Sequence, residues 1–189
     1  MPEPDRAIRF AIDAGASRFT VRAFAGGLLS ALAHSPTIAL RQFSGEARVD
    51  LANVEKSSLL VTADADSLTV IGDVPDKDRP EVERAMHEEV LQSGRFPEIV
   101  YECSRLSASK TGEGLYWVSL NGELSLHGVT RKQVIPARVS VGETSLKASG
   151  EFSLRQSDYG IKLVSAAGGT IKVKDELKLS FEIVARRQD

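Results

Sequence analysis

Apolar side chains return at every second position along residues 115–141, LYWVSLNGELSLHGVTRKQVIPARVSV. This period predicts two strands that join at His127-Gly128 and bury one face of a sheet. Trp117 and Asn121 lie on the opposite face, which we expect to be exposed to solvent. The residues predicted on the inner face are Tyr116, Val118, Leu120, Leu124, Leu126, Ile135, Ala137, Val139 and Val141.

Similar alternation occurs along most of the chain and predicts eight to ten strands, mostly antiparallel neighbours in sequence. A closed barrel is the natural arrangement because it leaves no exposed strand edge. The expected fold is therefore all-β, an extended up-and-down antiparallel barrel of about eight strands. The other predicted strands cover 8–12, 19–25, 38–51, 59–65, 68–71, 99–103, 146–154, 171–173 and 177–183.

The period changes to that of a helix between Asp78 and Gly94. Asp78 suits an N-cap, Pro80 suits the first turn, and an apolar stripe follows, so one helix is predicted at 79–93. Residues 28–33 are apolar but too few for an independent helix, and they predict a short helical turn. Pro36 ends that turn.

The inner face combines large aliphatic residues with small ones, while the chain has only eleven aromatic residues: seven Phe, three Tyr and one Trp. One interpretation is a hollow lumen for an elongated hydrophobic molecule, with Gly122 and Ala137 as gaps on its wall. The other is a flattened barrel whose walls meet and leave no space. Composition alone does not separate the two. The small residues are Ala39, Gly45, Ala47, Ala63, Ala65, Gly122, Ala137, Ala148 and Gly150.

Length and charge limit the remaining function classes. A chain of 189 residues suggests one domain, 1–189, with a sizeable core. The net charge of -2 favours neither nucleic acid nor an anionic membrane surface as partner. The lone Cys103 excludes an internal disulfide and is expected to be buried. No export signal and no run of about 18 apolar residues occurs, which predicts a cytoplasmic protein without a membrane span.

The candidate catalytic groups are few. The three histidines, His34, His87 and His127, lie at no metal-binding spacing, so no metal site is predicted. His87 is expected to face solvent and His127 to lie in a turn. His34 follows an apolar segment and could line the mouth of a cavity. A triad of His34, Ser35 and Asp158 has no sequence signature such as G-x-S-x-G to support it.

Two other functions stay open beside a binding role. One is a small hydrolase or isomerase that uses His34 near the cavity mouth. The other is an interaction protein with a collapsed barrel, for which the outward-facing Phe24 and Trp117 would be the anchors. A homodimer in which two chains share one cavity is also left open.

Four motifs resemble the YceI-like family. Arg155, Asp158, Gly160 and Ile161 match the third motif, in which Tyr159 replaces the commoner Phe. The segment SRFTVRAFAGG also fits the family's N-terminal strands, so the resemblance covers nearly the whole chain. The motifs are FPEIVYECSRL (96–106), NGELSLHGVTRKQVIP (121–136), GEFSLRQSDYGIKL (150–163) and GGTIKVKDELKLSFEI (168–183).

The resemblance implies a lipocalin-like barrel that binds a polyprenyl lipid or an isoprenoid quinone and has no catalytic role of its own. We therefore expect a carrier of an isoprenoid, quinone or fatty-acyl chain that requires no cofactor. Many relatives carry an export signal that is missing here, and residues 26–36 form an insertion. A head group would lie at the mouth, near His34, Arg155 or Tyr159. The expected ligand-binding residues are Leu28, Leu32, His34, Phe43, Tyr101, Leu120, Leu124, Phe152, Tyr159 and Phe181.

Overall fold

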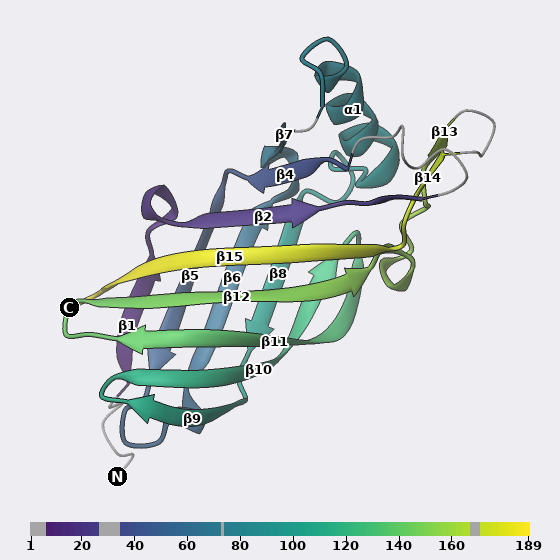
Figure 1. The fold of residues 1–189 in the computed structure, drawn as a ribbon. Coiled ribbons are helices and arrows are strands. Elements are labelled where there is room, and N and C mark those ends of the chain that lie inside the picture. Colours follow the sequence, from purple (N-terminus) through teal and green to yellow (C-terminus); the bar gives the residue numbers. More distant parts are fainter. Residues whose placement is uncertain (1–6, 27–34, 73, 167–170) are drawn as a thin grey trace.

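The fold is an antiparallel barrel in which eight strands follow one another around a closed ring (Figure 1). The computed structural model describes residues 7–26, 35–72, 74–166 and 171–189. The ring order is β1-β5-β6-β8-β10-β11-β12-β15, and pairing of β15 with β1 closes it. This arrangement confirms the all-β barrel of about eight strands that the alternation predicts.

The described strands are β1 Ile8–Ile12, β2 Arg18–Arg22, β3 Ala25–Gly26, β4 Thr37–Leu40, β5 Phe43–Val49, β6 Ser58–Asp64, β7 Leu68–Ile71, β8 Glu98–Cys103, β9 Leu106–Gly112, β10 Leu115–Leu126, β11 Val129–Val141, β12 Ser145–Arg155, β13 Ser165–Ala166, β14 Ile171–Val173 and β15 Glu176–Arg187. The helix α1 spans Arg79–Ala85 and continues as one wider turn over Met86–Val90. Short 3-10 turns occur at Ala14–Ala16, Val54–Lys56, Ala65–Ser67 and Gln156–Tyr159.

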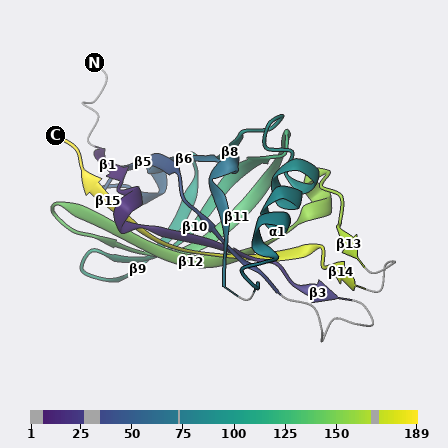
Figure 2. The same ribbon diagram turned by 90° about the horizontal axis from the view of Figure 1, so that it is seen from above.

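Three further strands lengthen the barrel at one end. β2 pairs with β15, β4 with β2, and β7 with β4. The helix α1 lies at this end, where β13, β14 and β3 also project as a small separate sheet (Figures 1 and 2). At the other end β9 pairs with β10. The barrel therefore has an elaborated end, called here the α1 end, and a simpler one.

The hairpin of β10 and β11 has the expected register. Tyr116 lies opposite Val139, and the ladder continues to Leu126 opposite Val129. The two turn residues have positive φ, 52° for His127 and 74° for Gly128. Two consecutive residues of positive φ make the turn whose twist matches that of the flanking strands. The inner and outer faces predicted for this hairpin are confirmed.

Some expected boundaries differ. The single strand expected at 38–51 is divided into β4 and β5, because Ser67 accepts a 2.9 Å hydrogen bond from the Gln42 N–H and fixes a bend there. The helix expected at 79–93 ends at Val90. Asp78 precedes it, but its side chain makes no capping hydrogen bond, so that expectation was wrong. The helical turn expected at 28–33 lies outside the described residues.

Candidate functional site

A cavity of about 610 Å³ lies inside the barrel. Its size is within the range typical of small-molecule sites. Apart from Ser57, Ser58, Asp78 and Gln156, every described residue that lines it is apolar or aromatic. The structure thus contains a hollow barrel, and the flattened, filled alternative does not hold.

The cavity follows the barrel from end to end. Val54 and Leu106 border it at the simpler end, whereas Val82 and Met86 of α1 border it at the other. The inward side chains from Tyr116 to Leu126 lie along the cavity wall. Ten residues of strand span about 33 Å. The space is therefore suited to a long molecule rather than a round one.

Tyr101 shows how the wall becomes wholly apolar in its middle. Its hydroxyl accepts a 3.2 Å hydrogen bond from the Gly122 N–H, and lies 3.1 Å from the Leu120 carbonyl and 3.0 Å from that of Gln133. Its one proton is donated to this pair of carbonyls. The Tyr101 hydroxyl is therefore fully hydrogen-bonded to backbone groups of the wall. Burial raises the pKa of the Tyr101 phenol. Only the face of the ring is left for a ligand.

Gly122 is needed for this arrangement and is not a gap for the ligand. A Cβ atom there would lie 2.6 Å from the Tyr101 ring and hydroxyl and 2.5 Å from the Glu102 carbonyl. At Gly150 the ring of Phe181 occupies the corresponding space, 2.7 Å from where a Cβ would be. Ala137 does line the cavity. The sequence interpretation of Gly122 as an open gap was therefore wrong, because an aromatic ring from a neighbouring strand covers it.

Three phenylalanines form an aromatic part of the cavity wall beside the β10–β11 hairpin, where β12 pairs with β11. The rings of Phe19 and Phe181 stack with their centroids 6.3 Å apart, and Phe152 meets Phe19 edge-on at 6.5 Å. They come from β2, β15 and β12, and all three line the cavity. Such pairs contribute beyond their buried area and fix the ring orientations. Sequence analysis identified Phe152 and Phe181 but missed Phe19, although its place in the β2 alternation could have shown it.

The helix α1 covers the cavity at its end of the barrel and is attached to the edge of β7. The Glu83 carboxylate accepts a 2.8 Å hydrogen bond from the Val70 N–H. His87 Nε2 donates to the Leu68 carbonyl at 2.9 Å, which assigns the proton to Nε2. These two side chains, one helical turn apart, satisfy an edge of β7 that no other strand among the described residues pairs. His87 was expected to face solvent, and the structure corrects this.

Two polar side chains mark the ends of the cavity. Gln156 is buried at the α1 end, where its Nε2 donates to the Lys174 carbonyl at 2.9 Å. Ser57 is buried at the other end, where its Oγ accepts a 3.1 Å hydrogen bond from the Asp50 N–H. The amide oxygen of Gln156 and the hydroxyl proton of Ser57 have no partner among the described residues. Each of these two groups can therefore offer one hydrogen bond to a ligand.

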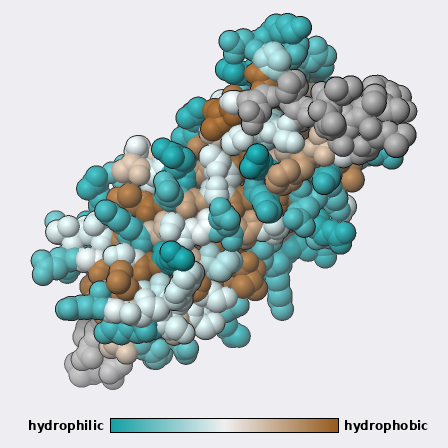
Figure 3. Space-filling view, viewed as in Figure 1, coloured by the Kyte–Doolittle hydropathy of each residue, from teal (hydrophilic) through white to brown (hydrophobic). Residues whose placement is uncertain are grey.

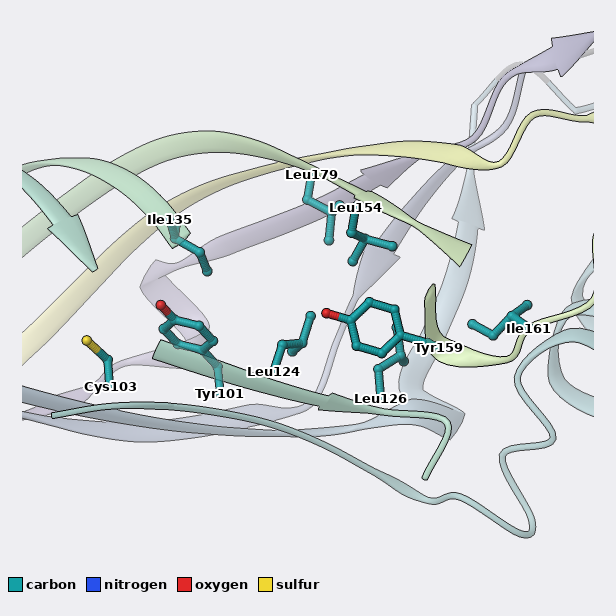
Figure 4. Packing of buried hydrophobic residues seen from close by; sticks show 9 residues of the cluster. All are labelled: Tyr101, Cys103, Leu124, Leu126, Ile135, Leu154, Tyr159, Ile161 and Leu179. Carbon is teal, nitrogen blue, oxygen red and sulfur yellow. The ribbon is translucent and has the colours of Figure 1, made fainter. Parts of the chain in front are cut away.

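Six of the ten residues expected to bind a ligand surround the cavity: Phe43, Tyr101, Leu120, Leu124, Phe152 and Phe181. Tyr159 is buried in the adjoining core cluster, and in Figure 4 its ring is seen between Leu126 and Leu154. It is not among the described residues that border the cavity. Leu28, Leu32 and His34 lie outside the described residues.

The other candidate groups have structural partners. His127 lies in the hairpin turn as expected, and its Nδ1, 3.1 Å from the Tyr159 carbonyl, tethers that turn. The Cys103 thiol is buried, donates to the Arg105 carbonyl at 3.1 Å, and has a raised pKa because of its burial. In the described ranges no cluster of three or more metal-ligating side chains occurs. Within the same ranges, no helix combines the length and apolar character needed to cross a bilayer.

Residues 10–185 match the model of a family described as the YceI-like domain. No protein of curated function has a sequence similar enough to match this chain.

Solved structures share the fold at low sequence identity. Burkholderia cenocepacia BcnA is similar at a TM-score of 0.66 and 17% identity, over 92% of this chain and 98% of its own. A polyisoprenoid binding domain from Saccharophagus degradans, implicated in plant cell wall breakdown, gives 0.64 and 12% over 95% and 98%. A Campylobacter jejuni YceI protein gives 0.57 and 16% over 80% and 85%. At these identities the likeness establishes the fold.

Proposed function

Because the chain belongs to the YceI-like family, we propose that it is a carrier that holds one elongated hydrophobic molecule inside its barrel. The observation that supports this most strongly is the apolar cavity, which follows the length of the barrel. The candidate ligands are an isoprenoid, an isoprenoid quinone or a fatty-acyl chain. A structural relative described as a polyisoprenoid binding domain favours the first two.

Affinity would come from the wall and not from a head group. Each buried methylene contributes about 0.8 kcal/mol, so a chain of ten carbons gains roughly 8 kcal/mol before the cost of immobilising it. Micromolar affinity corresponds to a net gain of about 8 kcal/mol, so a chain longer than ten carbons is needed once that cost is subtracted. Longer chains would bind more tightly, up to the length that the cavity accepts.

The proposed role is non-catalytic. The described residues that line the cavity include no histidine, cysteine or lysine. Their one carboxylate, Asp78, precedes α1, at the opposite end of the cavity from Ser57, so it cannot serve that hydroxyl as a general base. The alternative enzyme mechanism depends on His34, which lies outside the described residues, and nothing in the described part of the cavity favours it. A cytoplasmic location and a cavity shared by two copies remain predictions from the sequence.

The test is to identify what the purified protein carries. Native mass spectrometry should show an added mass, and organic extraction should release a long-chain apolar molecule. Replacing Ala137 by Phe places a ring in the cavity and should reduce the retained ligand at least tenfold. Ser140→Phe puts the same ring on the exposed outer face of β11 and should leave retention unchanged.

Two results would count against a carrier role. One is a wild-type protein that retains no apolar molecule and takes up none when it is extracted and offered a polyprenol, a quinone and a fatty acid. The other is equal retention by the Ala137→Phe and Ser140→Phe variants, which would place the ligand outside the cavity.

A further inference from the structure

One side of the cavity mouth at the α1 end is formed by two short segments, residues 162–164 and 172–174, called here the rim. Val164 and Val173 line the cavity, and the Val173 N–H donates a 3.0 Å hydrogen bond to the Val164 carbonyl. The rim adjoins the small sheet that projects beyond the barrel, since residues 162–164 lead into β13 and Lys172 and Val173 belong to β14 (Figures 1 and 2). It therefore borders the space through which a ligand would pass.

The rim is basic on its outer surface. Lys162, Lys172 and Lys174 are exposed, and Lys172 and Lys174 point away from the cavity because they alternate with the inward Val173. The Cγ of Lys174 lies 3.2 Å from where a Cβ of Gly26 would be, so this side chain runs along β3. In the described part of the chain none of these lysines forms an ion pair.

The positive surface continues onto the barrel. Lys178 of β15 lies directly opposite Arg22 of β2, a like-charge pair that is unfavourable unless an anion or solvent screens it. Two carboxylates, Asp175 and Glu176, directly follow Lys174 in the chain. Glu176 accepts a 3.4 Å hydrogen bond from the Ser153 hydroxyl, and Asp175 has partners of its own. It accepts hydrogen bonds from the Ser157 N–H and hydroxyl and lies 3.6 Å from Arg155. The net charge of -2 therefore conceals a locally basic region.

Apolar side chains stand among these cations. Leu163 is 46% exposed and Val164 37%, although both are large hydrophobic residues. In the space-filling view, apolar side chains are seen among polar ones beside this end of the barrel (Figure 3). Exposed apolar residues flanked by lysines are the combination that binds the interface of an anionic bilayer, where the former insert and the latter meet phosphate groups.

The opposite side of the mouth differs in charge. There Asp76, just before α1, pairs with Arg79 at 2.9 Å, and Glu88, in the turn that continues α1, pairs with Arg84 at 2.8 Å. The remaining acidic residues of α1 make that side net negative. An anionic surface would therefore meet the rim and avoid α1, and this sets the direction from which it approaches.

We propose that the rim docks on an anionic phospholipid bilayer and that the ligand exchanges between bilayer and cavity at that contact. The inference rests on the proposed function, because a long apolar molecule has negligible concentration in water and must be drawn from a membrane. The contact is peripheral and is made by side chains of the rim.

The test is co-sedimentation of the full chain, with its ligand extracted, with vesicles of phosphatidylcholine and phosphatidylglycerol and with vesicles of phosphatidylcholine alone. Binding should occur on the mixed vesicles and be lost as ionic strength rises from about 0.01 M to about 1 M, since the Debye length falls from about 30 Å to about 3 Å. The triple variant K162Q/K172Q/K174Q should bind the mixed vesicles roughly 100-fold more weakly, a factor of about five for each lysine.

The matched control is K56Q/K110Q/K147Q, which removes the same charge from exposed lysines outside the α1 end and should bind like the wild type. Leu163→Ser should weaken binding several-fold while leaving its salt dependence intact. Failure of the wild type to bind mixed vesicles, or equal binding by the two triple variants, would overturn the proposal. Binding of the rim to duplex DNA, without binding to the mixed vesicles, would also overturn the proposal.

Retained ligand is measured on the same samples by native mass spectrometry. A protein that carries ligand but does not bind vesicles would contradict the docking surface alone. A protein that binds vesicles through the rim but never carries a ligand would contradict the carrier role alone.

Discussion

Gly122 and Tyr101 are complementary in shape and in hydrogen bonding. The glycine leaves room for the ring, and its N–H donates to the Tyr101 hydroxyl at 3.2 Å. Neither residue is informative alone in the sequence, since Gly122 suggests a gap and nothing in the sequence indicates that Tyr101 covers it. Together they produce a smooth apolar wall. Alternation predicts on which face a side chain lies, but it does not predict which neighbour fills the space beside it.

Gly122→Ala should therefore destabilise the protein. The added methyl would meet the ring of Tyr101 and a backbone carbonyl that cannot move aside, at a cost of about 1–3 kcal/mol. Urea unfolding should show a lower midpoint with an unchanged slope. The control is Gly94→Ala, where no atom lies within 4 Å of the added group. An equal effect at both positions would contradict the role assigned to Gly122.

The stability of the fold should also fall in alkali. Burial raises the pKa of Tyr101, Tyr159 and Cys103, so each keeps its proton longer in the folded protein than in the unfolded chain. Above the ordinary values, about 8.5 for Cys and about 10 for Tyr, the unfolded chain binds fewer protons. Stability is therefore fully present below those pKa values and falls above them, by up to about 1.4 kcal/mol per pH unit for each group.

Tyr101→Phe should make this decline shallower above about pH 10, in urea unfolding measured at successive pH values. At neutral pH the same variant should be about 1–2 kcal/mol less stable, because the Gly122 N–H loses its acceptor. An alkaline slope identical to that of the wild type would show that the Tyr101 phenol ionises as readily in the folded state as in the unfolded one.

At the scale of elements, α1 combines two tasks. Its apolar side chains close the cavity, while Glu83 and His87 satisfy the backbone of β7. The helix itself was predictable from Pro80 and the apolar stripe that follows. The orientation of His87 was not, because the Leu68 carbonyl that it meets belongs to an edge strand nineteen positions away. The division of residues 38–51 into β4 and β5 was missed for the same reason, since Ser67 imposes it.

The double variant Glu83→Ala/His87→Ala should loosen α1 over the cavity mouth. Losing the two hydrogen bonds to β7 should lower stability by about 2–3 kcal/mol and speed exchange of the Val70 amide hydrogen. The rate of ligand release should also increase, because α1 covers the cavity mouth. Hydrogen exchange with mass spectrometry provides the measurement, and Glu81→Ala, on the exposed side of the same helix, is the control. Unchanged Val70 exchange would contradict the attachment.

At the scale of the molecule, the barrel encloses space that side chains do not fill, so the ligand should act as part of the core. Extracted protein should melt at a lower temperature than loaded protein. A ligand at 100 times its Kd adds about 2.7 kcal/mol, which for a chain of this size raises Tm by roughly 5–10 °C. Scanning calorimetry before and after reloading provides the measurement. The Ala137→Phe variant should show no such rise, and an equal rise in that variant would place the stabilising site elsewhere.

The pairing of β1 with β15 sets the order in which the chain can fold. Phe10 lies opposite Arg187, so the ring closes through a contact between nearly the first and nearly the last of the described residues. The first barrel strand in chain order waits for the last one, and until then the sheet has two open edges. Contacts of such long sequence separation slow folding, and open edges pair with other chains. Until β15 pairs with β1, the closed barrel cannot protect the nascent chain from aggregation. During that period its protection depends on other molecules that cover the two open edges.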